Sequence, residues 1–382
     1  MLIILAFLLP TLFFIVFFLR KLKVPTVVGY ILAGLVLAYF FPQIKDFQEV
    51  KHLDFFYELA IALSFFYVGM EFPFSKIVDS LKNLKNAIID FVFNFFPIFG
   101  LALLLLPLKL ALIVALALYP SSTALVIRLL VEYKRLTNKE SLYLIDILIM
   151  EDLIIILSLI LLSPLLQGTE LNLDDLAMIF LKLLVVGIIY LIIRAKFLDY
   201  LKRLFIESQM EDYFILFLIG TILLLFVSFK ELGVIEYLGP FLFGSLVAEI
   251  NKSEVVSKYL ISFKEFSLAI FFFLFGLSIN LNSINLEIIP WIIVLSITAI
   301  ITKILSTYIA LYTTLKDKEA SLRGALSFVP RGEFSIILAS MNKGAQVVIL
   351  PVVITTIAVG IVLFVLADKI AKILTKKQIK TT

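Results

Sequence analysis

The chain has 382 residues, of which 62% are hydrophobic, and its mean hydropathy of +1.12 excludes a soluble globular protein. It contains no cysteine, which excludes disulfide bonds and thiolate metal sites, and its one histidine, His52, lies in a polar connector. The formal net charge of +4 is modest and gives no reason to expect nucleic acid as a partner. This composition indicates a protein built of membrane-spanning helices.

Apolar segments of roughly 18–25 residues recur along the chain, each long enough to cross a hydrocarbon core about 30 Å thick. They predict an all-α membrane protein with thirteen transmembrane helices, near residues 2–19, 24–42, 53–71, 87–106, 109–127, 141–164, 177–194, 213–229, 233–250, 262–279, 289–313, 321–341 and 346–368. The first segment lacks a basic leader and a small-residue cleavage site, so we expect it to be retained and not removed as a signal peptide.

The distribution of positive charge predicts the orientation of these spans. Most of the 33 Lys and Arg residues lie in the connectors after the odd-numbered spans or in the C-terminal tail. The connectors after the even-numbered spans hold only Lys45, Lys51, Lys109, Lys230 and Lys343. Because cytoplasmic connectors carry the excess of Lys and Arg, we expect a multi-pass protein of the cell membrane with its N-terminus outside and its C-terminus in the cytoplasm.

Three sequence landmarks recur at an interval of about 210 residues, which indicates an internal repeat. The matching pairs are GYILAGLVLA around Gly34 with LGPFLFGSLVAE around Gly244, YVGMEF around Gly69 with LFGLSI around Gly276, and YPSSTALVI around Pro120 with VPRGEFSII around Pro330. Each pair links spans seven apart, and since seven is odd, the copies cross the membrane in opposite directions. We therefore predict an inverted-topology repeat: six spans over residues 1–170, a linker helix over 171–205, and six spans over 206–382.

The third landmark also predicts two discontinuous helices that cross. Small or polar residues follow the two mid-span prolines, as Pro120, Ser121, Ser122 and Thr123 in one span and as Pro330, Arg331, Gly332 and Glu333 in the other. Proline cannot donate to the helical ladder, so both helices should be interrupted near the bilayer midplane. The unpaired backbone groups and hydroxyls at such interruptions suit a hard monovalent cation. A simple proline kink is the alternative at each position.

Two adjacent acids, Glu151 and Asp152, stand within an otherwise apolar run. A charged side chain in hydrocarbon costs at least about 3 kcal/mol, and neighbours on a helix point about 100° apart, so the two acids cannot face one partner. Lys303 lies mid-way in its own span, and we predict that it pairs with Glu151 and leaves Asp152 for the transported ion. Acids kept only for packing, or a lysine that only neutralises the site, are the alternatives. Asp90 and Asp146 also lie within or near spans, and we interpret them as cavity-lining or helix-packing acids with no assigned role.

In order, the landmarks GYILAG, VGMEF, PSSTA, the Glu-Asp pair, the mid-helix lysine and PRGEF resemble the monovalent cation:proton antiporter superfamily, in its Kef/Nap-like branch, over nearly the whole chain. The resemblance implies a homodimer without a cofactor. It implies a mobile core domain, near residues 53–164 and 262–341, and a dimerisation domain, near 2–42 and 213–250. It also implies that Asp152 binds the ion and the proton, with Ser122 and Thr123 as further Na⁺ ligands, that Glu151 pairs with Lys303, and that Arg331 and Glu333 are supporting charges.

The expected function is exchange of Na⁺ or Li⁺ for H⁺ by alternating access, with cation and proton competing for Asp152. Similar proteins more often carry Asp-Asp, Asn-Asp or Gln-Asp at the acid pair, and two acids favour electrogenic exchange by resemblance to the Asp-Asp members. The chain ends at Thr382 without the nucleotide-binding module of glutathione-gated potassium members, which favours Na⁺ over K⁺/H⁺ exchange or Kef-like K⁺ efflux. No enzyme is expected, because the motifs G-x-S-x-G and H-E-x-x-H are absent.

Overall fold

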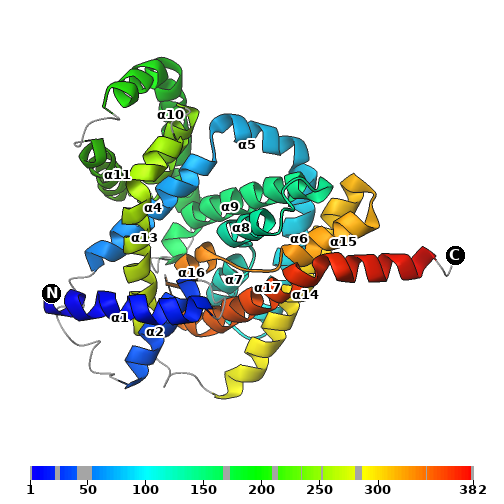
Figure 1. Cartoon of the computed structure of the whole chain (residues 1–382). Coiled ribbons are helices and arrows are strands. Elements are labelled where there is room, and N and C mark those ends of the chain that lie inside the picture. The colour runs from blue at the N-terminus through cyan, green and yellow to red at the C-terminus, as the bar shows by residue number, and fades with distance from the viewer. Residues whose placement is uncertain are drawn as a thin grey trace. The chain divides into compact units, whose positions relative to one another are not determined.

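The computed structural model describes residues 2–21, 26–40, 54–166, 173–208, 214–233, 235–250, 253–279, 286–340 and 342–379. Over these ranges the chain is helical apart from short connections (Figure 1). The one exception in the described chain is an isolated antiparallel bridge between Ser121 and Arg331. The predicted all-α class is therefore confirmed for the described residues. His52, Lys45 and Lys51 lie outside them.

A helix, or a pair of shorter helices, occupies each predicted span. Six segments of the described chain are long and apolar enough to cross a membrane: Val78–Leu103, Ala177–Lys196, Phe214–Glu231, Leu260–Ser278, Ile289–Leu315 and Gly344–Thr375. Four shorter apolar helices accompany them: Leu9–Phe18, Thr26–Phe40, Leu108–Ala117 and Leu238–Glu249. The number of thirteen crossings stays a prediction.

The chain divides into two compact units, the first of which comprises residues 1–76 and 159–281. Its described helices are α1 (Leu2–Lys21), α2 (Thr26–Phe40), α4 (Asp54–Glu71), α10 (Leu173–Ser208), α11 (Phe214–Glu231), α12 (Leu238–Glu249) and α13 (Ser253–Ser278). Buried apolar side chains of α4, α11, α12 and α13 form one continuous core, and α1 packs against α2.

Four landmark glycines hold helices of the first unit in close contact. Gly34 of α2 and Gly276 of α13 each lie against the backbone of the other's helix, and Gly69 of α4 and Gly244 of α12 do the same. In every case the nearest atom is the carbonyl oxygen three residues before the partner glycine, and an added Cβ would overlap it. Small residues at helix contacts let backbones approach closely in membrane proteins, which explains why glycine stands at these positions.

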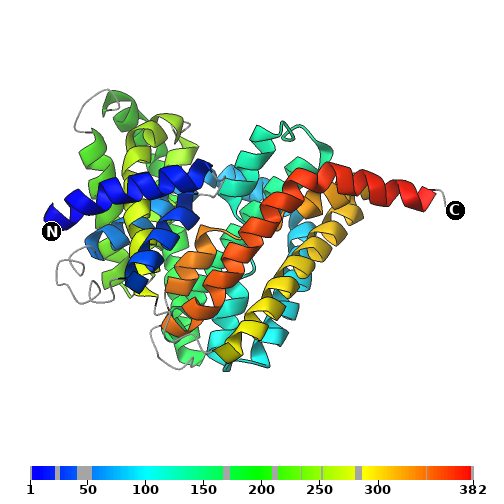
Figure 2. The same cartoon turned by 60° about the horizontal axis from the view of Figure 1, so that its bottom comes forward.

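The second unit comprises residues 77–158 and 282–382. Its main helices are α6 (Leu84–Leu103), α7 (Leu108–Ala117), α8 (Thr123–Glu132), most of α9 (Lys139–Leu166), α14 (Ile289–Leu315), α15 (Lys318–Ser327), α16 (Glu333–Ser340) and α17 (Lys343–Ile379). The short helices α5 (Phe74–Ser80) and η2 (Leu81–Asn83) precede α6, and η4 (Leu286–Ile288) precedes α14. α14 packs along α6, and Figure 2 shows α17 running beside α14 and α16.

Candidate functional site

Both predicted helix interruptions are present, and both lie in the second unit. α7 ends at Ala117 and α8 begins at Thr123, so the chain around Pro120 is not helical. α15 ends at Ser327 and α16 begins at Glu333, which leaves Pro330 in the second gap. Proline removes one N–H from the helical ladder and clashes with the preceding turn, which explains why the breaks fall here. The predicted interruption of both helices is therefore confirmed, and the alternative, a simple proline kink in a continuous helix, is wrong at both positions.

The two interruptions touch each other. The Ser122 N–H donates to the Pro330 carbonyl at 2.8 Å, and the Ser121 hydroxyl donates to the Phe328 carbonyl at 2.9 Å. Gly332 lies so close to Ser122 that a Cβ there would come within 2.8 Å of the Ser122 Cα. Backbone groups that the breaks remove from the helices are therefore satisfied in part by the opposite break.

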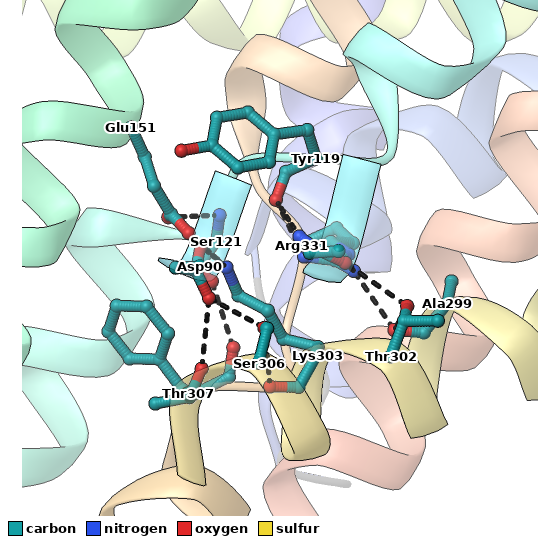
Figure 3. Close-up of polar contacts among 12 residues, drawn as sticks. Asp90, Tyr119, Ser121, Glu151, Ala299, Thr302, Lys303, Ser306, Thr307 and Arg331 are labelled. Atoms are coloured by element: carbon teal, nitrogen blue, oxygen red, sulfur yellow. Dashed lines mark hydrogen bonds and ion pairs between the residues drawn. The ribbon is translucent and has the colours of Figure 1, made fainter. Parts of the chain in front are cut away.

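Lys303 of α14 lies fully buried between two carboxylates, as Figure 3 shows. Its ammonium group contacts Glu151 of α9 and lies 2.9 Å from Asp90 Oδ2 of α6. The rings of Phe328 and Tyr119 flank it, with centroids 4.9 and 5.5 Å from Nζ. The predicted contact between Lys303 and Glu151 is present. The contact with Asp90 was not predicted, because Asp90 was interpreted only as a cavity-lining or helix-packing acid.

Asp90 is held mainly by hydroxyls of α14. Ser306 Oγ donates to its Oδ1 at 2.7 Å, and Thr307 Oγ1 donates to the same oxygen at 3.3 Å. Lys303, Ser306 and Thr307 stand at positions i, i+3 and i+4, which share one helix face. This polar stripe beside the lysine is a signal in the sequence that could have indicated a further anion on a neighbouring helix.

The adjacent acids turn to different partners, as their angular separation on a helix requires. Glu151 accepts a hydrogen bond from the Ser121 N–H at 2.7 Å in addition to its contact with Lys303. Asp152 accepts one from the Thr123 hydroxyl at 2.9 Å. Glu151 is fully buried and Asp152 is 2% exposed, so neither acid points outward to the lipid.

The predicted Na⁺ ligands Ser122 and Thr123 have different surroundings. Thr123 begins α8 and lies beside Asp152, as a shared cation site would need. Ser122 is the N-cap of α8, and its hydroxyl accepts the Leu125 N–H at 3.3 Å. That hydroxyl supports the helix start. The role of either residue in cation binding stays a prediction.

Arg331 is fully buried and binds neutral acceptors. It donates to the carbonyls of Tyr119 at 2.9 Å and Ala299 at 3.0 Å, and to Asn94 Oδ1 at 3.2 Å. Asn94 also donates to the Tyr119 carbonyl at 2.9 Å and accepts the Thr302 hydroxyl at 3.1 Å. The Tyr119 carbonyl lies just beyond the C-terminus of α7, where a cation balances the helix dipole. Arg331 therefore joins the second break to the first, and among the described residues it makes no ion pair.

Glu333, the other predicted supporting charge, is the first residue of α16 and is half-buried. An acid in the first turn of a helix is stabilised by the positive end of the helix dipole. Within the described part of the chain it forms no ion pair with Lys303 or Arg331. The structure therefore places it at the break and outside the group of charges around Lys303.

The buried charges of this region do not cancel. We call Asp90, Glu151, Asp152, Lys303 and Arg331 the site cluster; each is at most 2% exposed. Three acids against two bases leave one negative charge when all are ionised. A buried net charge is costly, and a bound cation or proton neutralises it. The arrangement can therefore hold one monovalent cation or exchange it for protons.

Comparisons with known proteins agree on one family. The family described as "Sodium/hydrogen exchanger, transmembrane" matches residues 3–371. The ammonium/H⁺ antiporter subunit AmhT of Alkalihalophilus pseudofirmus is 30% identical over 366 residues, which cover 95% of this chain and 92% of that protein. The K⁺/H⁺ antiporter subunit KhtU of Bacillus subtilis is 26% identical over 77% of this chain and 73% of its own.

A solved structure shares the fold. The sodium proton antiporter MjNhaP1 from Methanocaldococcus jannaschii matches with a TM-score of 0.71 at 15% identity, over 97% of this chain and 98% of that chain. At 15% identity this likeness shows the fold alone. The family match and the 30% identical relative show the class of activity. The chain belongs to the sodium/hydrogen exchanger family: it is a multi-pass membrane cation:proton antiporter and not an enzyme.

Proposed function

We propose that this antiporter binds its cation and its protons in turn at Asp152, by alternating access. The observation that carries the proposal is the place of Asp152, buried beside Thr123 at the start of α8, where two interrupted helices cross. Glu151 is already engaged by Lys303 and by the Ser121 N–H. Asp152 is therefore the acid of the pair that does not contact the lysine.

Na⁺ or Li⁺ is the first candidate for the cation. The sequence resemblance favours it, and the fold is that of a sodium proton antiporter. K⁺ or NH₄⁺ is the second candidate, because the two curated relatives are named as ammonium/H⁺ and K⁺/H⁺ antiporter subunits. Both are named as subunits, so the second candidate includes a further protein in the assembly.

We further propose the predicted architecture of thirteen crossings and an inverted repeat, with the N-terminus outside and the C-terminus in the cytoplasm of a cell-membrane homodimer. The glycine contacts support the repeat. The repeat relates Gly34 to Gly244 and Gly276 to Gly69, and the close contact of the Gly34 and Gly276 helices has its counterpart in that of the Gly244 and Gly69 helices. The two interruptions, at matching places in the copies, support it as well. The division into a mobile core domain, expected near residues 53–164 and 262–341, and a dimerisation domain, expected near 2–42 and 213–250, belongs to the same proposal. One change is made to it: α4 and α13 share a core with α11 and α12 in the first unit, so we assign them to the dimerisation domain.

Purified protein in proteoliposomes provides the test of Asp152. Proton flux would be followed after addition of Na⁺, Li⁺, K⁺ or NH₄⁺ at several pH values, with protein-free vesicles as a reference because NH₃ crosses bilayers unaided. Saturable flux with one or more cations is expected, and Asp152→Asn should abolish it. Asp146→Asn is the matched control, since Asp146 lies on the same helix but binds Asn83 at 2.6 Å, away from the site cluster. Flux retained in Asp152→Asn would remove Asp152 from the mechanism.

A further inference from the structure

Lys303 has two anionic partners, although its pairing with Glu151 alone would satisfy the family resemblance. Asp90 comes from α6 and Glu151 from α9, and both carboxylates are fully buried (Figure 3). A buried ammonium group needs one anion to offset its desolvation. The second carboxylate therefore requires an explanation of its own.

The bond between Asp90 and Lys303 is built into a two-helix scaffold. α6 packs along α14, and Asp90 receives hydrogen bonds from Lys303, Ser306 and Thr307, all on α14. Three donors on one helix hold this carboxylate against α14. Glu151 reaches the same lysine from α9 and is bound at its other oxygen by the Ser121 N–H. Asp90 and Lys303 thus stay paired without any help from α9.

We propose that Asp90 is the standing counter-ion of Lys303 and a positioning residue for transport: its charge gives the site cluster one more acid than base and so makes it fit for a single monovalent cation. This inference rests on the proposed cation site at Asp152. Without Asp90, the lysine and Arg331 would balance Glu151 and Asp152. The empty site would then be neutral and would have little electrostatic attraction for a cation.

The effect of Asp90 on cation affinity follows from Coulomb's law. One unit charge about 10 Å away, at an effective dielectric constant of about 20, changes an affinity roughly tenfold. Asp90→Asn keeps the shape of the side chain and an oxygen that accepts from Ser306, and it removes the charge. We expect the half-saturating cation concentration to rise about tenfold or more, with little change in the maximal flux. Asp90→Glu should restore it to within about threefold of the wild type.

A double variant separates charge balance from packing. Lys303→Gln alone should tighten cation binding, and Asp90→Asn with Lys303→Gln should return the half-saturating concentration to near the wild-type value. A purely structural role for the Asp90–Lys303 pair predicts instead that Lys303→Gln on its own weakens cation binding, as Asp90→Asn does, and that the double variant does not recover the wild-type value. Asp146→Asn again serves as the control carboxylate, because Asp146 binds Asn83 and, among the described residues, no member of the site cluster.

The experiment is proteoliposome flux against cation concentration, using whichever of Na⁺, K⁺ and NH₄⁺ gives the largest wild-type signal. An unchanged half-saturating concentration in Asp90→Asn overturns this inference. The proposed function is tested separately: it stands if the wild type shows flux and Asp152→Asn does not. If Asp90→Asn does not fold, Asp90→Ser replaces it, because it also removes the charge and leaves a small polar side chain. A rise of about tenfold is again expected, and no rise overturns the inference equally.

Discussion

Two groups of charges in the second unit differ in a way that separates function from stability. The first is the site cluster around Lys303. The second, which we call the end cluster, consists of Arg135, Glu140, Arg323 and the hydroxyl of Ser327, near the ends of α8, α9 and α15, with the half-exposed Asp368 of α17. Both contain acids and bases in close contact. Only the first has carboxylates that compete for one lysine.

The end cluster pairs its charges as a clamp. Arg323 binds Glu140 through two nitrogens, at 2.6 and 2.9 Å, and approaches Asp368 at 3.4 Å. Arg135 donates to the Ser327 hydroxyl at 2.9 Å and lies 4.6 Å from the Phe364 ring centroid. Burial lowers the pKa of the Arg135 guanidinium, while the Asp368 and Glu140 carboxylates favour its charged form. Two-pronged Arg–carboxylate contacts give fixed geometry, as a structural joint needs.

The difference teaches how to recognise a transport site among buried charges. In the end cluster, both oxygens of Glu140 are taken by one guanidinium. In the site cluster, single contacts from different helices meet on Lys303, and three buried acids face two buried bases. The further acids beside Arg323, which are Glu319 and Asp368, have side chains that are 37% and 51% exposed, so water can offset their charge. Substitutions in the end cluster, where the pairing is fixed, are therefore expected to lower stability. Substitutions in the site cluster, where the buried charges do not balance, are expected to impair transport.

Asp152→Asn should have the largest effect on transport and a small effect on folding. The variant removes a negative charge from a cluster that has one in excess, so the apo protein should unfold within a few degrees of the wild type. Ligands stabilise the state that binds them, so the wild type should gain thermal stability from the transported cation while the variant does not. Thermal unfolding in detergent, with and without the cation, measures both. Equal cation-dependent stabilisation of the two proteins would contradict the assignment.

Lys303→Ala should cause the largest loss of stability. It leaves Asp90 and Glu151 buried without their shared cation, and breaking a buried pair costs roughly 3–5 kcal/mol. The melting temperature should fall, and the charge moved per cation in a voltage-clamped proteoliposome should change. A variant with unaltered stability and unaltered charge movement would mean that this lysine is dispensable to both.

Arg323→Ala tests the structural role of the end cluster. It removes the two-pronged contact with Glu140, and we expect a loss of roughly 2–3 kcal/mol in unfolding free energy. Flux per folded molecule and the half-saturating cation concentration should stay within about twofold of the wild type. Arg323→Lys is the matched variant, since it keeps the charge but not the two-pronged geometry. A selective loss of cation affinity would show that the end cluster also takes part in transport.

Thr123→Val should have the smallest effect. It keeps the shape of the side chain and removes the hydroxyl that contacts Asp152, a change worth about 1 kcal/mol. The half-saturating cation concentration should rise about fivefold if the hydroxyl is also a cation ligand. Concentration-dependent flux is the measurement, and an unchanged value would leave Asp152 without this ligand.

The sequence was sufficient for the features that have local causes. Apolar runs predicted the helices, Pro120 and Pro330 predicted the interruptions, and the depth of Lys303 predicted its contact with Glu151. These predictions needed only helix periodicity and the cost of burying charge.

Apart from the pairing of Lys303 with Glu151, contacts between distant positions could not be predicted from the sequence. Asp90 and Lys303 are 213 positions apart in the sequence. The cost of burying a charge indicates that each needs an oppositely charged partner, but it does not identify which residue that partner is. Arg331 illustrates the same limit, because carbonyl oxygens of Tyr119 and Ala299 bind it and every residue carries such an oxygen. Lys182 is a second example: it lies within a predicted span, and it donates to the backbone carbonyls of Leu232 and Gly233, just after the end of α11.

The central claim is that a cation and protons occupy the same buried acid, and the pH dependence of cation affinity tests it most directly. Solid-supported membrane currents would give the half-saturating cation concentration of the wild type over a range of pH. Competition predicts that this concentration rises up to about tenfold for each unit of falling pH on the acidic side and levels off at high pH. A half-saturating concentration that stays constant across the whole range would contradict a shared site.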